Sequence, residues 1–202
     1  PRSGPARPAA GLRDAAGASA PIESTLAGNP LRALQNLERL AAQSPEATPA
    51  ERRYRLGLEG QALIQAGRTD DAKVAFAPVI AKTQLVRKFD ALQRWMDAID
   101  ASDNKKAEDF DAKIAANKRD FEARFARAQV LMAKQRFTDA MDELLEILMR
   151  DKAWNEELAR KTYIAILEII EPPKVKVADG QIPPDDPVVA SYRRRLSSIV
   201  LS

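Results

Sequence analysis

The stretch LIQAGRTDDAKVAF, Leu63–Phe76, decides the fold because a later stretch of the chain repeats its pattern. The later stretch is LMAKQRFTDAMDEL, Leu131–Leu144, in which Ala140 takes the place of Ala72. The two alanines lie 68 positions apart, which is two periods of about 34 residues, a spacing typical of stacked helix–turn–helix units. The sequence therefore predicts an all-α helical-repeat fold.

Composition agrees with a helical chain and removes many kinds of chemistry. Among 202 residues, 45% are hydrophobic and 30% charged, with only eight glycines and 5% aromatic residues, which favours helices over a sandwich or barrel. Histidine and cysteine are absent, so thiolate nucleophiles, histidine bases, the usual zinc ligands and disulfides are excluded. No phosphate-binding loop, dinucleotide fingerprint or nucleophile elbow is present. We expect a protein that is not an enzyme, with no cofactor, metal or small-molecule substrate.

Charge and hydropathy point to protein partners. The net charge of +3 is mild and the signs alternate along the predicted helices, a pattern that does not favour nucleic acid. The best apolar run, YIAILEII at Tyr163–Ile170, is far shorter than the roughly 20 residues that a membrane span needs.

The chain divides into a tail, residues 1–28, and a helical domain, residues 29–202. The tail is rich in Pro, Ala and Arg and cannot bury a core by itself. It is either the remnant of an organelle-targeting sequence or, alternatively, an interdomain linker or a disordered tail. The domain opens with a helix after Asn29, a predicted N-cap followed by Pro30. Further helices are predicted over residues 50–66 and 70–82.

The repeats share a pattern of small residues where two helices approach each other. These positions are Gly60 and Ala128 in the first helix of a repeat, and Ala72 and Ala140 in the second. The chain therefore resembles a tetratricopeptide repeat protein, an α-solenoid of about three helical pairs with extra terminal helices. We place the repeat starts near Arg53, Arg87 and Phe121.

The middle repeat departs from the pattern. Arg94 and Lys106 fall where the small residues should be. We still predict a helical pair there, with residues 107–120 as its second helix.

Two motifs near the C-terminus carry a narrower resemblance. RDKAWNEELARK includes Arg150, Asp151, Trp154, Asn155, Ala159, Arg160 and Lys161, and DDPVVASYRRRL includes Asp186, Pro187, Val189, Tyr192, Arg193, Arg194, Arg195 and Leu196. In order and spacing they resemble the C-terminal region of the chaperedoxins, co-chaperones in which a thioredoxin domain precedes a tetratricopeptide-like domain. Here no Cys-x-x-Cys motif occurs, so we expect the helical part without the redox half. A proline-rich insertion, residues 171–184, is a second departure.

The resemblance implies a protein-interaction module that binds client proteins or chaperonin. It also implies that the C-terminal helix, predicted over residues 185–201, docks a partner. The alternative is a structural accessory subunit of a large, mitochondrial assembly. The expected compartment is the mitochondrial matrix or the bacterial cytoplasm.

Two surfaces are candidates for partner binding. The C-terminal helix has an apolar stripe that is predicted to pack on the preceding helix, and the rest of its surface either has no further role or docks a partner. The candidate residues on this helix are Tyr192, Arg193, Arg194, Arg195, Ile199, Val200 and Leu201. The concave repeat face is the other surface; its candidate residues are Tyr54, Gln61, Ile64, Phe125, Gln129 and Met132. That face mixes apolar and amide groups, which favours a peptide held by apolar contacts over a carboxylate clamp.

The start of the helix after the last repeat has a simpler interpretation. Trp154 is predicted to anchor the end of the repeat core. Asn155 is predicted to cap this helix, and Glu156 and Glu157 match the positive end of its dipole.

Overall fold

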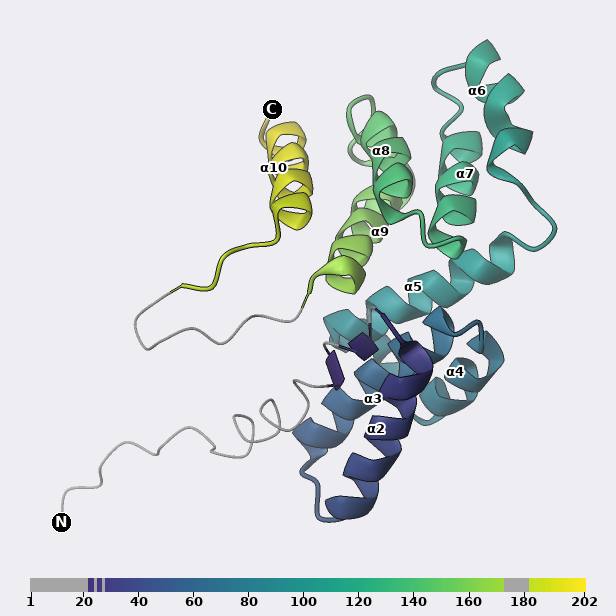
Figure 1. Ribbon diagram of the computed structural model, residues 1–202. Coiled ribbons are helices and arrows are strands. Elements are labelled where there is room, and N and C mark those ends of the chain that lie inside the picture. Colours follow the sequence, from purple (N-terminus) through teal and green to yellow (C-terminus); the bar gives the residue numbers. More distant parts are fainter. Residues whose placement is uncertain (1–21, 24, 27, 173–181) are drawn as a thin grey trace. The chain divides into compact units, whose positions relative to one another are not determined.

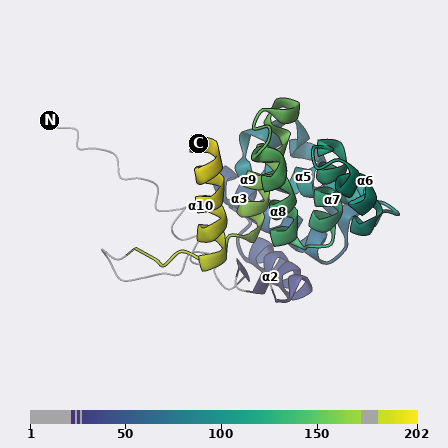
Figure 2. The same cartoon turned by 90° about the horizontal axis from the view of Figure 1, so that it is seen from above.

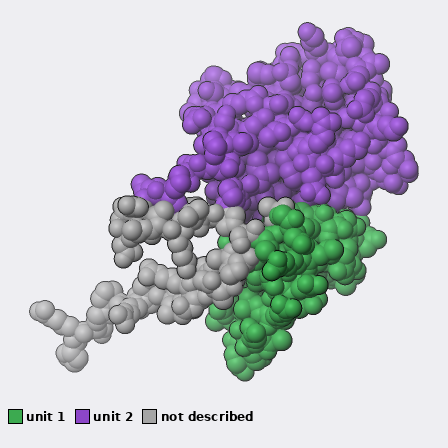
Figure 3. All heavy atoms as spheres, viewed as in Figure 1, with its two compact units in different colours: residues 1–78 green, residues 79–202 purple. Residues whose placement is uncertain are grey.

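The computed structural model describes residues 22–23, 25–26, 28–172 and 182–202. Every regular element in these ranges is a helix, which confirms the predicted all-α repeat fold. The chain forms two compact units, residues 1–78 and 79–202 (Figure 3). The sequence had indicated one domain over residues 29–202 and no boundary between Pro78 and Val79. Most of the predicted tail and of the insertion, residues 1–21 and 173–181, lies outside the described residues.

The first unit contains α2 (Pro30–Gln43), α3 (Pro49–Gln65) and α4 (Thr69–Phe76). Each of the first two helices starts at a proline that follows a capping side chain. Asn29 Oδ1 accepts a hydrogen bond from the Arg32 amide at 3.0 Å, which confirms the predicted cap. The side chains thus satisfy amides that a helix leaves unpaired at its start.

The predicted boundary of the tail at residue 28 is wrong for part of that segment. Ile22 and Leu26 are 3% and 6% exposed, and the Thr25 hydroxyl donates to the Ile22 carbonyl at 2.9 Å. These apolar side chains come from the end of the tail, where the composition changes from Ala, Gly and Pro to Ile and Leu. The core of the first unit therefore begins before Asn29.

The second helix of the first repeat is shorter than the predicted range of residues 70–82. After Phe76, α4 continues as a 3-10 helix, η1 (Ala77–Leu85). Pro78 has no amide hydrogen to give to the Val74 carbonyl, and its ring crowds that carbonyl. The α-helical ladder therefore ends there, close to the boundary between the two units.

The second unit holds the remaining helices (Figure 1). They are α5 (Arg87–Ala101), η2 (Ala107–Phe110), α6 (Asp111–Ala116), α7 (Phe121–Ala133), α8 (Phe137–Leu148), α9 (Trp154–Ile170) and α10 (Pro187–Leu201). α5 packs against α7 and α9, and α8 packs against the same two helices. α9 therefore returns to the middle repeat and completes a core that four helices surround.

The middle repeat is a helical pair in a shifted register. Arg94 does not enter the helix contact but pairs with Asp90 at 2.9 Å, and the fully buried small residue is Ala91. In the second helix the buried small residue is Ala107 instead of Lys106. That helix is η2 followed by the single short helix α6, so the predicted range of residues 107–120 is too long.

A buried ion pair joins α7 to α8. Arg124, which is 6% exposed, pairs with Glu143 at 2.9 Å. Its Nε also donates to the Lys118 carbonyl at 2.9 Å. A buried charge is tolerated only when it is paired and hydrogen-bonded, so this pair fixes how the two helices meet.

Candidate partner-binding surface

α10 starts at Pro187, within two residues of the predicted start, and lies beside α8 and α9 (Figure 2). Asp186 caps it by accepting hydrogen bonds from the amides of Val188 and Val189 at 3.0 and 2.9 Å. An acidic cap followed by proline at the first helical position is a strong start signal. These two signals explain why the start of α10 could be predicted from the sequence.

The contact between α10 and its neighbours is largely polar. The Tyr163 hydroxyl on α9 donates to the Tyr192 carbonyl at 2.8 Å. The Tyr192 hydroxyl in turn donates to Asp142 Oδ1 on α8 at 3.1 Å, and Arg195 donates to the same oxygen at 2.7 Å. The Arg195 guanidinium also lies 4.8 Å from the centre of the Tyr192 ring. We call Asp142, Tyr163, Tyr192 and Arg195 the tyrosine cluster.

Both tyrosines of the cluster remain protonated across the neutral range. Burial raises the pKa of Tyr163 well above its ordinary value. Burial also raises the pKa of Tyr192, and the nearby Asp142 carboxylate raises it further. Protonated hydroxyls can donate, so the two hydrogen bonds of the cluster are maintained at neutral pH.

Apolar contact contributes little to the position of α10. Only Val189 is fully buried, at 2% exposed. Ile199 and Val200 are half-buried and Leu201 is 86% exposed. The apolar stripe therefore packs at one end of the helix and becomes accessible towards the other.

The three predicted arginines have different environments. Arg193 pairs with Glu171 at 2.7 Å and Arg195 with Asp142, both with side chains near half exposure. Arg194 is exposed and makes no ion pair with any described residue. Successive residues on a helix point in different directions, so only Arg194 of the three faces solvent without a partner among them.

Sequence reasoning missed the groups that receive α10. Tyr163 lies inside the apolar run YIAILEII, which was considered only for its length as a membrane span. Asp142 and Glu171 gave no signal, because nothing in the pattern places them opposite arginines more than 20 positions away. The signal that could have helped is the isolated hydroxyl of a tyrosine on an apolar helix face, which needs a partner when buried.

Half of the predicted concave surface is covered by the protein itself. Gln61, Ile64 and Met132 are only 6%, 2% and 1% exposed. A partner would therefore find almost no side-chain surface at these three positions. Tyr54 is 38% exposed, so it is the accessible member of the set in the first unit.

In the second unit, Phe125 and Gln129 are half-buried. The Trp154 ring lies over Phe125 with 5.5 Å between ring centres, and 6.2 Å from the Phe121 ring. Trp154 thus packs on the first helix of the last repeat, as an anchor would, and covers part of the face predicted for a peptide.

The predicted cap of α9 is wrong. Ala153 occupies the cap position without a side-chain hydrogen bond, and Asn155 is left-handed with φ of 47°. Glu156 and Glu157 are left-handed as well. The regular right-handed part of α9 therefore begins after residue 157, and Asn155 does not stand directly before it.

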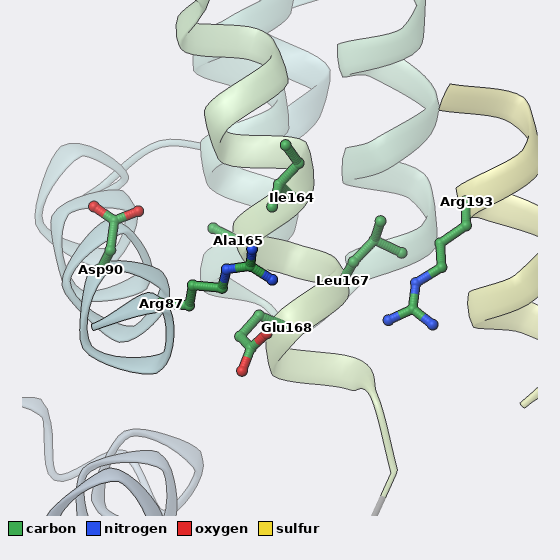
Figure 4. Close-up of a pocket in the computed structure, with 7 residues that line it drawn as sticks. All are labelled: Arg87, Asp90, Ile164, Ala165, Leu167, Glu168 and Arg193. Atoms are coloured by element: carbon green, nitrogen blue, oxygen red, sulfur yellow. The ribbon is translucent and has the colours of Figure 1, made fainter. Parts of the chain in front are cut away.

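A cavity of about 240 Å³ opens between α5, α9 and α10 (Figure 4). Its lining residues are Arg87, Asp90, Ile164, Ala165, Leu167, Glu168 and Arg193. The volume is below the roughly 300–1,000 Å³ typical of sites for small organic ligands. It is better described as a notch with an apolar floor and arginines from two different helices.

The described ranges have neither a metal-binding cluster nor a membrane-spanning helix. They contain no group of three or more acidic, histidine or cysteine side chains that could hold a metal ion. Within the same ranges, no helix combines the length and apolar character that crossing a membrane requires.

Paired helices that pack in sequence order, with small residues at the crossings, define a helical-repeat protein. A family model described as "Tetratricopeptide repeat" matches residues 100–200. The match spans half of the chain, and the chain belongs to this family. Repeats of this family generally mediate protein–protein interactions. A comparison with curated proteins found no match.

Proposed function

We propose that the chain is a non-enzymatic protein-interaction module of the chaperedoxin type, which binds client proteins or chaperones during folding or assembly. Membership of the tetratricopeptide repeat family supports a protein partner. The proposal rests mainly on the low burial of α10, a helix of 15 residues in which only one side chain is buried. Such a helix adds little to the core of its unit, and its accessible surface suits recognition.

The docking surface is the C-terminal half of α10. Arg194 and Leu201 are exposed, and Ile199 and Val200 are half-buried. A helix with an apolar stripe beside a positive charge binds a partner by lying in an apolar groove. The large exposed side chain at Leu201 would provide an anchor for such a groove.

Capture of partners by the full chain tests the proposal. The full chain and a chain ending at Asp185 are used as bait in a native extract, and bound proteins are quantified by mass spectrometry. Arg194→Glu is expected to reduce capture at least severalfold, whereas Arg39→Glu, an exposed arginine on α2, is expected to change it little. Equal capture by all four baits would refute docking through α10.

The stoichiometry of the captured proteins separates the two functions. Many substoichiometric proteins together with a chaperone are expected for a module of the chaperedoxin type. One fixed set of stoichiometric subunits would instead indicate a structural accessory subunit.

A further inference from the structure

α10 is attached to its unit in a way that allows it to leave. Its single fully buried side chain is Val189, and the tyrosine cluster and the Arg193–Glu171 ion pair add polar contacts. Segments with few buried apolar contacts open at a cost well below that of global unfolding. α10 can therefore be released while α9 stays in place.

The ion pairs that hold α10 are partly exposed, so their carboxylates could be replaced by those of another protein. The side chains of Arg195 and Asp142 are 47% and 49% exposed, and those of Arg193 and Glu171 are 45% and 28% exposed. Exposed pairs contribute little in water, so carboxylates on another protein could replace these two with little change in free energy.

Charge defines the partner of a released α10. The sequence from Pro187 to Ser202 has three arginines and no acidic side chain. Its internal receptor has the opposite character, because Asp142 pairs with Arg195 and Glu171 with Arg193, while Val189 is buried. A partner that receives the same helix needs the same complement, which is an apolar groove with an acidic rim.

The connection to α9 is long enough for release. Residues 171–186 join the two helices, which is about twice the upper end of the two to eight residues that usually connect packed helices. Fully extended, a chain of this length spans about 50 Å. By its length alone, the connection does not require α10 to stay beside the end of α9.

We propose, building on the protein-interaction function above, that α10 binds its partner after leaving α8 and α9, and that the face it now turns inward then joins Arg194 and Leu201 in the contact. That face is formed by Val189, Tyr192, Leu196 and Ile199. The partner presents an apolar groove with an acidic rim, and Asp142 and Tyr163 hold the helix on its own unit until the groove replaces them. The internal site and the partner therefore compete for the same side chains.

Competition has a measurable consequence. While the released form is the minor one, the apparent affinity for the partner is proportional to the released fraction. A substitution that weakens the internal site without touching α10 should therefore strengthen partner binding by the same factor. A helix that bound its partner while docked would give the opposite result.

Release is measured first, on the full chain and without a partner. An isolated helix of about 15 residues is marginal in water, so released α10 unfolds and exposes its arginines to trypsin. Asp142→Asn removes the charge that Arg195 contacts, and we expect cleavage after residues 193–195 to be about five- to tenfold faster. Asp139→Asn is the matched control, since Asp139 lies on the same helix with similar exposure and pairs with Arg136. Equal rates for the two variants would overturn the proposal.

Tyr163→Phe provides a second variant that keeps the buried ring and removes only the hydroxyl that donates to Tyr192. It should accelerate the same cleavage to a similar degree. Cleavage that stays at the wild-type rate in both Asp142→Asn and Tyr163→Phe would show that the cluster does not hold α10, and the proposal would fall while docking through α10 could still stand.

Partner binding is measured next, with the proteins that the full chain captures and the chain ending at Asp185 does not. Asp142→Asn should capture about five- to tenfold more of them at subsaturating bait than Asp139→Asn does. Reduced capture would mean that docked α10 is the binding form and would overturn the proposal. If the full chain and the shortened chain capture the same proteins, the proposed docking function itself fails, and this inference fails with it.

Discussion

α9 and α10 are neighbouring helices of similar length, 17 and 15 residues, but the second unit holds them by different means. α9 buries seven residues, among them Tyr163 and Ile166, against α5 and α8. α10 buries only Val189, and it otherwise depends on a hydrogen bond from the buried Tyr163 and on ion pairs whose side chains remain partly in water. Apolar burial dominates stability, so α9 belongs to the core and α10 is attached to it.

In this short part of the chain, α9 contributes to stability and α10 is available for recognition. A helix that completes the core cannot leave it without unfolding the unit. A helix that adds little to the core can be used for binding at small cost to the fold. Substitutions in the two helices should therefore differ in which property they change.

The largest effect is expected in α9. Ile166→Ala removes a side chain with no exposed surface and should lower the free energy of unfolding by about 2–5 kcal/mol. Urea unfolding followed by tryptophan fluorescence measures this, because both tryptophans, Trp95 and Trp154, lie in the second unit. Ile164→Ala, at a position 44% exposed on the same helix, should cost less than about 1 kcal/mol. Similar losses for both would contradict the burial described here.

The next effect compares two adjacent acids of α8. Glu143→Gln leaves the buried Arg124 without its main partner and should cost about 3 kcal/mol of unfolding free energy. Asp142→Asn weakens the exposed pair with Arg195 and the hydrogen bond from the Tyr192 hydroxyl and should cost about 1 kcal/mol. The same urea titration measures both. If the cost at residue 142 matched that at residue 143, α10 would be part of the core.

A smaller, local effect is expected for the single apolar anchor of α10. Val189→Ala removes about two carbon atoms of buried surface, worth about 1.6 kcal/mol, which corresponds to roughly tenfold faster opening. Hydrogen exchange should detect this acceleration in the amides of α10 and no change in those of α9. Equal acceleration in both helices would show that they open together.

The smallest effect is a pH dependence above the neutral range. The pKa of Tyr163 is raised in the folded protein. Its hydroxyl therefore stabilises the folded state fully below the pKa of an unfolded tyrosine, about 10, and this stabilisation is lost as the pH rises through the higher pKa of the folded state. A phenolate cannot donate to the Tyr192 carbonyl, so tryptic release of α10 should accelerate above pH 10 in the wild type. Tyr163→Phe should show a smaller rise, which comes from Tyr192 alone, and identical pH profiles would argue against the hydrogen bond.

The repeat architecture was predictable from the sequence because the small residues at the helix crossings recur at a fixed offset. Ala72 and Ala140, which reveal the period, are both fully buried. The middle repeat was harder, since Arg94 stands at the expected crossing and Ala91 takes its role one turn earlier. A period locates helices, but the local choice of crossing residue depends on the helices that pack there.

The candidate surface was predictable in part. The α10 stripe and its exposed end follow from helical spacing, and Leu201 is accessible as expected. Ile64 and Met132 were assigned to an open face by repeat position but are buried, because repeat position does not reveal which neighbours cover that face. The contact of Tyr163 with the Tyr192 backbone depends on where α10 folds back, and no pattern in the connection before it specifies that.

The most direct test of the central claim is hydrogen exchange of the unmodified protein, compared between α9 and α10 under conditions where the unit stays folded. If α10 is attached to the core and α9 is part of it, the slowest amides of α10 should exchange at least about a hundredfold faster than the slowest amides of α9, a difference of about 2.7 kcal/mol in opening free energy. Equal protection of the two helices would show that α10 opens only when the unit unfolds, and would contradict the account.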